Sequence, residues 1–118
     1  MSINKELAKK WVAALRSGEY KQTGNVLRNL DGFCCLGVLC DILDSGKWNN
    51  NKRFIFFDEL DDNKLYESGT EIPNTIWYNM FGNTSSQNLL IDMNDLGASS
   101  FYEIADYVET TLGLAHNV

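Results

Sequence analysis

The sequence predicts an α+β fold in which three to four helices pack on a small antiparallel sheet, within a single domain. Three observations lead to this prediction. Apolar residues recur at helical spacing near both ends of the chain, and residues 33–43 are apolar nearly throughout. Residues 53–58 (RFIFFD) are rich in aromatic and β-branched types, as strands are. The chain has 118 residues, 44% of them hydrophobic and 22% charged, which fits one globular domain.

The first helix is predicted over residues 4–17. The apolar residues that recur at helical spacing here form one stripe: Ile3, Leu7, Trp11, Ala14 and Leu15. Ser2 or Asn4 can cap the start of the helix, and Gly18 suits the left-handed position after its end. The connection that follows is rich in turn residues, and we expect a short strand in it around residues 26–30.

Residues 33–43 are predicted to form a buried helix, because this apolar run is too long for a typical strand. Only Gly37 and Asp41 interrupt it. A glycine inside a helix costs about 1 kcal/mol relative to alanine. We therefore expect another backbone or a bulky side chain to pass close to Gly37. Gly46 is predicted to end this helix.

The middle of the chain predicts a turn, a strand and a helix. The asparagines at residues 49–51 form a polar turn before the strand at 53–58, and loops are predicted at 58–64 and 67–71. Pro73 suits the first position of a short helix that runs to residue 81 and is closed by the next glycine.

The C-terminal part predicts one further well-marked helix. A polar loop at residues 83–88, a short apolar element at 89–93 and a turn at 94–97 are predicted before it. The helix itself begins with Ser100 and Glu103, which have the S-x-x-E spacing of a capping box.

The three cysteines, Cys34, Cys35 and Cys40, are predicted to be reduced thiols in the core. Their odd number cannot pair completely, and the C-C-x4-C spacing lacks the second pair or the histidines of a zinc site. The one histidine, His116, lies in the tail, and an apolar setting makes a thiol unreactive. We therefore expect no disulfide, no metal or other cofactor, and no catalytic cysteine.

Charge is distributed unevenly along the chain. The net charge is −6, yet residues 1–30 carry six bases and two acids, and no lysine or arginine follows Lys64. Overall acidity argues against general nucleic-acid binding, which depends on neutralising phosphates. The basic N-terminal third leaves room for a local anion site. The apolar runs are too short to span a membrane and no signal peptide is recognisable, so we expect a cytoplasmic protein.

The candidate ligand site lies in the basic turn after the first helix. Its residues are Arg16, Tyr20, Lys21, Gln22 and Arg28, and Asn94 joins them if its own turn folds back. Arginines bind phosphate or carboxylate through two nitrogens, and a tyrosine stacks on a base or donates its hydroxyl. Structural alternatives stay open: Arg16 can cap the last carbonyls of its helix, Gln22 can satisfy a turn, and Asn94 can be a turn or cap residue.

Three segments resemble a widespread family of small, mostly uncharacterised bacteriophage proteins. They are residues 11–22 (WVAALRSGEYKQ), residues 32–41 (GFCCLGVLCD) and residues 93–97 (MNDLG) leading into 101–106 (FYEIAD). The resemblance implies a phage or prophage product that acts inside a bacterium. Accessory phage proteins of this size often disarm host defence, by binding a host protein or by sequestering a nucleotide-derived immune signal.

The function expected from these observations is that of a non-enzymatic, homo-oligomeric binder that sequesters an anionic, nucleotide-like signal. Oligomerisation is expected because the strand at residues 54–57 is apolar on both faces, which fits either burial on both sides or pairing with a second copy. One alternative is a protein–protein inhibitor that binds a host defence protein through its acidic half, residues 65–118. Another is an enzyme that acts on a nucleotide.

Overall fold

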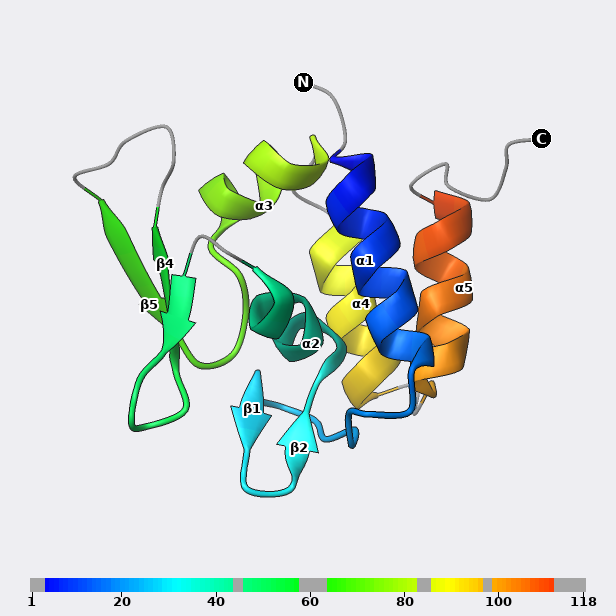
Figure 1. The fold of residues 1–118 in the computed structure, drawn as a ribbon, viewed down its shortest axis with the longest axis horizontal. Coiled ribbons are helices and arrows are strands. Elements are labelled where there is room, and N and C mark those ends of the chain that lie inside the picture. Colours follow the sequence, from blue (N-terminus) through cyan, green and yellow to red (C-terminus); the bar gives the residue numbers. More distant parts are fainter. Residues whose placement is uncertain (1–3, 44–45, 58–63, 83–85, 97–98, 112–118) are drawn as a thin grey trace.

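The computed structural model describes residues 4–43, 46–57, 64–82, 86–96 and 99–111. Within these ranges the chain forms five helices and two small antiparallel sheets (Figure 1). The helices are α1 (Lys5–Arg16), α2 (Cys35–Ile42), α3 (Asn74–Phe81), α4 (Ser86–Asp95) and α5 (Phe101–Thr111). The strands are β1 (Arg28–Asn29), β2 (Gly32–Phe33), β3 (Gly46–Trp48), β4 (Phe54–Phe57) and β5 (Leu65–Ser68).

Helix α2 lies at the centre of the fold and contacts α1, α4, β2 and β3. Helices α1, α4 and α5 form one half of the molecule, and the sheet β3-β4-β5 forms the other (Figure 1). One hydrophobic core draws on every helix and on β4. Its largest fully buried side chains are Trp11, Trp77, Phe54, Phe56 and Phe81. The predicted α+β class is therefore confirmed, although the strands form two sheets and the described helices outnumber the three to four expected.

Helix α1 confirms the prediction for residues 4–17. The Asn4 side chain accepts a hydrogen bond from the Leu7 backbone N–H at 3.1 Å and so caps the helix; Ser2 lies outside the described residues. Gly18 follows the helix with φ 78°. Trp11 is fully buried, and its indole Nε1 donates to the Cys35 carbonyl at 2.9 Å. Because that bond satisfies the polar atom of the ring, the indole can anchor α1 on α2 inside the core.

Helix α2 confirms that most of the apolar run 33–43 forms a buried helix, although Phe33 belongs to β2 and Cys34 is the N-cap. Gly37 is the point of closest approach of this helix. A Cβ placed on Gly37 would lie 1.8 Å from the Leu27 carbonyl oxygen. That carbonyl is fixed, since it accepts a hydrogen bond from the Cys34 N–H at 3.1 Å. The backbone that passes close to Gly37 is therefore the segment that leads into β1.

The prediction that Gly46 ends the buried helix is wrong. Helix α2 ends at Ile42, with the extended residue Leu43 as its cap, and Gly46 begins β3. A Cβ on Gly46 would lie 2.2 Å from the Phe54 ring and 2.5 Å from the Ile55 carbonyl oxygen. This glycine is thus needed for close packing between strands, which the sequence pattern does not distinguish from a helix stop.

The two sheets confirm the strands expected near residues 26–30 and 53–58. Strand β1 pairs with β2 in a hairpin, and β4 lies between β3 and β5. The prediction of a loop at residues 67–71 is wrong for Glu67 and Ser68, which belong to β5. Most of the loop predicted at 58–64 lies outside the described residues. Strand β5 has little apolar pattern of its own, so pairing with β4 fixes it.

Helix α3 ends at Phe81, and Gly82 follows it with φ 75°, which confirms the predicted stop. The prediction that Pro73 is the first residue of the helix is wrong by one position, because Pro73 is the N-cap. Helix α5 confirms the capping box: the Ser100 N–H donates to Glu103 at 2.8 Å, and the Glu103 N–H donates to Ser100 at 3.2 Å. Among the described residues, no helix is long and apolar enough to cross a bilayer.

Helix α4 corrects two predictions, because it includes the end of the loop expected at residues 83–88 and the start of the turn expected at 94–97. Gln87 is only 2% exposed. Its side chain accepts from the Ile72 N–H at 2.6 Å and donates to the Ile72 carbonyl at 2.9 Å. A polar residue whose partner is far away in sequence is indistinguishable from a loop residue by composition, which explains the error.

Candidate functional site

Arg16 lies in the last turn of α1 and binds α5. Its guanidinium is 2.6 Å from the Asp106 carboxylate and 3.1 Å from that of Glu109. The hydrogen bonds to Glu109 and then to Asp106 raise the pKa of Arg16 above its already high usual value. The charge of Arg16 is therefore largely neutralised by two acids of the C-terminal half. It joins α1 to α5, a role different from capping its own helix.

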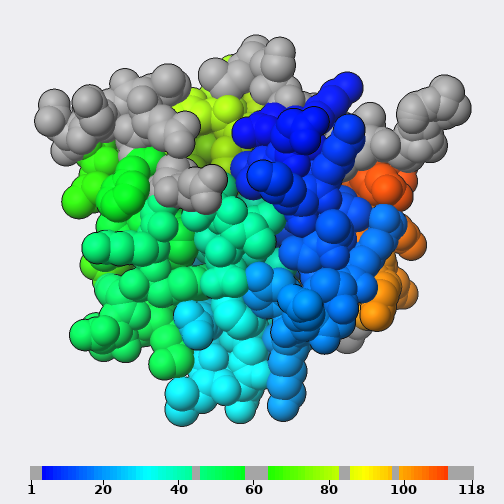
Figure 2. All heavy atoms as spheres, viewed as in Figure 1, coloured from blue at the N-terminus to red at the C-terminus, as the bar shows by residue number. Residues whose placement is uncertain are grey.

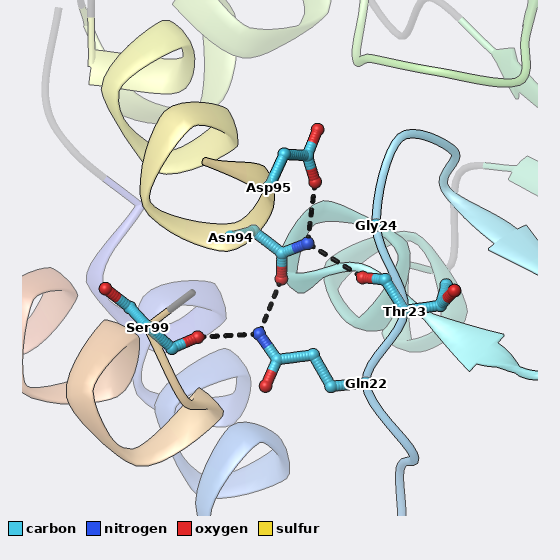
Figure 3. Close-up of a pocket in the computed structure, with 6 residues that line it drawn as sticks. All are labelled: Gln22, Thr23, Gly24, Asn94, Asp95 and Ser99. Atoms are coloured by element: carbon cyan, nitrogen blue, oxygen red, sulfur yellow. Dashed lines mark hydrogen bonds between the residues drawn. The ribbon is translucent and has the colours of Figure 1, made fainter. Parts of the chain in front are cut away.

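Gln22 and Asn94 meet in a polar network between the loop after α1 and the end of α4 (Figure 3). Gln22 Nε2 donates to Asn94 Oδ1 at 2.9 Å and to the Ser99 carbonyl at 2.8 Å. Asn94 Oδ1 also accepts from the Cys35 N–H at 3.2 Å, and Asn94 Nδ2 donates to the Thr23 carbonyl at 2.8 Å. One amide thus connects the loop after α1, the start of α2 and the segment before α5.

A cavity of about 390 Å³ opens beside this network. Its lining residues are Gln22, Thr23, Gly24, Asn94, Asp95 and Ser99 (Figure 3). Asp95 Oδ1 accepts from Asn94 Nδ2 at 2.9 Å and from the Asn25 N–H at 3.0 Å. Because Asn94 is 7% exposed and both atoms of its amide group bind protein, its geometry is that of a structural link.

A second group of polar and aromatic side chains surrounds Arg28. The Arg28 guanidinium carbon lies 5.0 Å from the centre of the Phe33 ring and 5.3 Å from that of Trp48. The Tyr20 ring meets Phe33 edge-on, with centroids 5.0 Å apart. The surface view shows the β1–β2 hairpin between the segment after α1 and the three-stranded sheet (Figure 2). We call Tyr20, Arg28, Phe33, Asp41 and Trp48 the Arg28 cluster.

The exposed carboxylate of Asp41 organises the aromatic side of the Arg28 cluster. It accepts a hydrogen bond from the Tyr20 hydroxyl at 2.7 Å and another from the Trp48 indole at 3.1 Å. Burial, followed by the hydrogen bond to Asp41, raises the pKa of Tyr20 to about 12. Tyr20 therefore stays protonated at neutral pH and remains a hydrogen-bond donor to this carboxylate.

Arg28 has no carboxylate partner within the described ranges. The ion pairs found there involve Arg16 and Arg53, which binds Glu67 at 2.8 Å. Arg28 instead lies over two aromatic rings, which attract a cation through their π faces. Its nitrogens consequently keep their capacity to donate to an external anion.

The six residues predicted to form one ligand site do not lie together in the structure. Gln22 and Asn94 share the cavity network, Tyr20 and Arg28 share the Arg28 cluster, and Arg16 binds α5. Lys21 is exposed, and its backbone carbonyl accepts from the Phe33 N–H at 2.8 Å.

Sequence reasoning missed Phe33, Asp41 and Trp48 as members of the Arg28 cluster. Asp41 was a usable signal, because an acid inside an apolar run marks the side of the helix that faces solvent. Trp48 had no such signal, since its contact with Arg28 arises from the fold alone.

The cysteines confirm the prediction of buried, reduced thiols. Burial raises the pKa of Cys34 to about 11, and it raises the pKa values of Cys35 and Cys40 well above the usual value. Cys34 Sγ also accepts from the Gly37 N–H at 3.4 Å at the start of α2. Among the described residues, no group of three potential metal ligands occurs; His116 lies outside them.

We expect these thiols to react slowly in the native protein. With a pKa near 11 in place of 9.0 for Cys34, the thiolate fraction at pH 8 falls roughly 100-fold. Iodoacetamide labelling followed by mass spectrometry should show all three cysteines modified in urea and none over the same time without it. Rapid labelling of one cysteine in the native protein would contradict the buried assignment.

The fold and its side-chain clusters define a small α+β domain with charged and aromatic residues gathered at its surface. The chain belongs to a family described as a domain of unknown function (DUF8296), whose model matches residues 3–112. No curated protein and no solved structure matches the chain.

Proposed function

We propose that this chain is a non-enzymatic phage accessory protein that acts in the cytoplasm of a bacterial host. It counters host defence as a homo-oligomer that sequesters an anionic, nucleotide-derived signal, with the Arg28 cluster as its binding surface. The observation that supports this proposal most directly is the environment of the Arg28 side chain. Its guanidinium lies on Phe33 and Trp48 and has no acid partner within the described ranges.

The chemistry of the cluster suits a ligand that combines a flat ring with negative charge. A guanidinium supported by aromatic rings offers a plane on which a base can stack, and its nitrogens can bind a phosphate through two hydrogen bonds. Tyr20 and Trp48 donate to Asp41, so hydrogen bonds disperse part of the negative charge beside Arg28. Arg16, which the sequence also suggested, is neutralised by Asp106 and Glu109 and contributes less.

Arg28→Ala should weaken ligand binding at least about tenfold, because it removes a charge-assisted contact and a stacking plane together. Titration calorimetry against a panel of cyclic nucleotides and ADP-ribose derivatives measures this effect. Lys10→Ala, on the exposed side of α1, removes the same charge and should leave affinity unchanged.

Two results would overturn this proposal. One is the absence of binding to every member of the panel by a folded protein. The other is an equal loss of affinity in Arg28→Ala and Lys10→Ala, since that would indicate a general charge effect. Mass spectrometry of the released ligand addresses the enzymatic alternative, because a binder returns the ligand with its mass unchanged.

A second candidate function is inhibition of a host protein through the acidic C-terminal half. Three exposed apolar side chains favour it: Leu89 at 46%, Leu96 at 81% and Tyr102 at 59% exposure, in a region that also carries exposed Asp92. Apolar side chains next to acids suit a basic partner. A pull-down from host lysate at low and high salt tests it, because such an interface should weaken with salt.

A further inference from the structure

The three-stranded sheet has an outer face with no helix of the described chain packed on it (Figure 1). In the register of the sheet, Ile55 lies opposite Lys47 on β3 and Glu67 on β5, and Phe57 lies opposite Leu65. Residues that are directly opposite in a sheet share a face. Arg53, which directly precedes β4 two residues before Ile55 and pairs with Glu67, lies on this face too. We call Lys47, Arg53, Ile55, Phe57, Leu65 and Glu67 the outer sheet face.

The two faces of this sheet differ sharply in burial. Phe54 and Phe56 point into the core and are at most 1% exposed. On the outer sheet face, Phe57 is 40% exposed and Leu65 is 64% exposed, and these two side chains are cross-strand neighbours. Single exposed apolar residues are common, whereas an adjacent pair of large ones on a sheet is a candidate for a contact with another chain.

The charges of the outer sheet face are arranged with opposite signs on its two sides. Lys47 lies on one side of Ile55 and forms no ion pair within the described ranges. Glu67 lies on the other side, and among the described residues its partners bind Oε2 alone: Arg53 at 2.8 Å and Asn49 at 3.1 Å. Its Oε1 is left for a further cation.

We propose that two copies of this chain pack through the outer sheet face, related by a two-fold axis that runs along the strand direction. This axis places Ile55 and Phe57 of each copy against the same residues of the other. It also brings each Lys47 over the second copy's Glu67, twice in the symmetric pair. In this arrangement the Arg53 side chains of the two copies both lie near the axis, each paired with the Glu67 of its own copy. An axis across the strands would place Lys47 over Lys47 and Glu67 over Glu67, so these two positions favour the first arrangement. The inference names the surface of the oligomer in the proposed function and is independent of its ligand.

Charge reversal tests the arrangement by sedimentation equilibrium without ligand, over about 1 to 500 µM. The short strands suggest a weak dimer, with a Kd on the order of micromolar to tens of micromolar. Lys47→Glu and Glu67→Lys should each raise this Kd at least about tenfold, because each places like charges together. An equimolar mixture of the two variants should dimerise again, since each mixed pair restores both contacts.

Apolar variants give an independent readout. Phe57→Ser should also raise the dimer Kd, whereas Leu30→Ser should not, although Leu30 is 91% exposed at the β1–β2 turn. Circular dichroism confirms that each variant is folded. A wild-type monomer at 500 µM would overturn the inference. So would a mixture of charge variants that stays monomeric. Charge variants that each keep the wild-type Kd would also overturn it, as expected if copies paired through strand edges instead. If the chain stays monomeric over this whole range and still binds ligand, this inference is overturned while the ligand-binding part of the proposed function stands.

Discussion

Gly37→Ala is expected to lower the free energy of unfolding by about 3 kcal/mol or more, the upper part of the range for overpacked cores. The new Cβ would lie 1.8 Å from the Leu27 carbonyl oxygen. Leu27 cannot shift easily, because its carbonyl accepts from the Cys34 N–H at 3.1 Å and its N–H donates to Gly69 at 2.7 Å. Urea denaturation followed by circular dichroism measures the change.

The sign of the change in unfolding free energy distinguishes an effect of packing from an effect of helix propensity. Alanine favours a helix interior over glycine by about 1 kcal/mol, so propensity alone would stabilise the variant. Gly18→Ala is the control: Gly18 has φ 78° and no neighbouring atom within 4 Å of its added Cβ. It should cost only about 1 to 2 kcal/mol, the cost of a left-handed alanine. A stabilised Gly37→Ala variant would show that the Leu27 backbone moves away freely.

Sequence patterns predicted those helices and strands whose determining residues lie within a few positions of one another in the chain. The capping box of Ser100 and Glu103 marked α5, and the apolar run around Gly37 marked α2 and its close contact. Strand β5 could not be found in this way. Its edge position leaves Leu65 exposed and pairs Glu67 with Arg53, so its sequence resembles a loop.

The candidate site was only partly predictable, for the same physical reason. Arg16 and Arg28 were both predicted as ligand contacts because they lie in the basic turn. The residues that bind each arginine in the fold, however, come from distant segments. Arg16 finds Asp106 and Glu109 on α5, whereas Arg28 finds the Trp48 ring on β3. An arginine is available for a ligand only if the fold gives it no acid, and the sequence around the arginine does not contain that information.

Asn94 shows how a residue suggested as a ligand contact can instead hold the fold together. Asn94→Ala is expected to lower the free energy of unfolding by about 3 kcal/mol, because it leaves buried polar partners unsatisfied. The losses are the acceptor of Gln22 Nε2 and of the Cys35 N–H, and the donor to the Thr23 carbonyl. Urea denaturation again measures the effect, with tryptophan fluorescence as a second probe.

Asn88→Ala is the matched control, since Asn88 is an exposed asparagine of the same helix, α4. It should change stability by less than about 0.5 kcal/mol, as exposed substitutions usually do. If Asn94→Ala were as mild as Asn88→Ala, the network around Asn94 would not be structural, and the adjoining cavity would become a candidate ligand site. A large loss confined to Asn94→Ala supports the reading that this amide joins α4 to α2 and to the loop after α1. The search for ligand contacts then centres on Arg28, whose guanidinium packs on aromatic rings and has no acid partner within the described ranges.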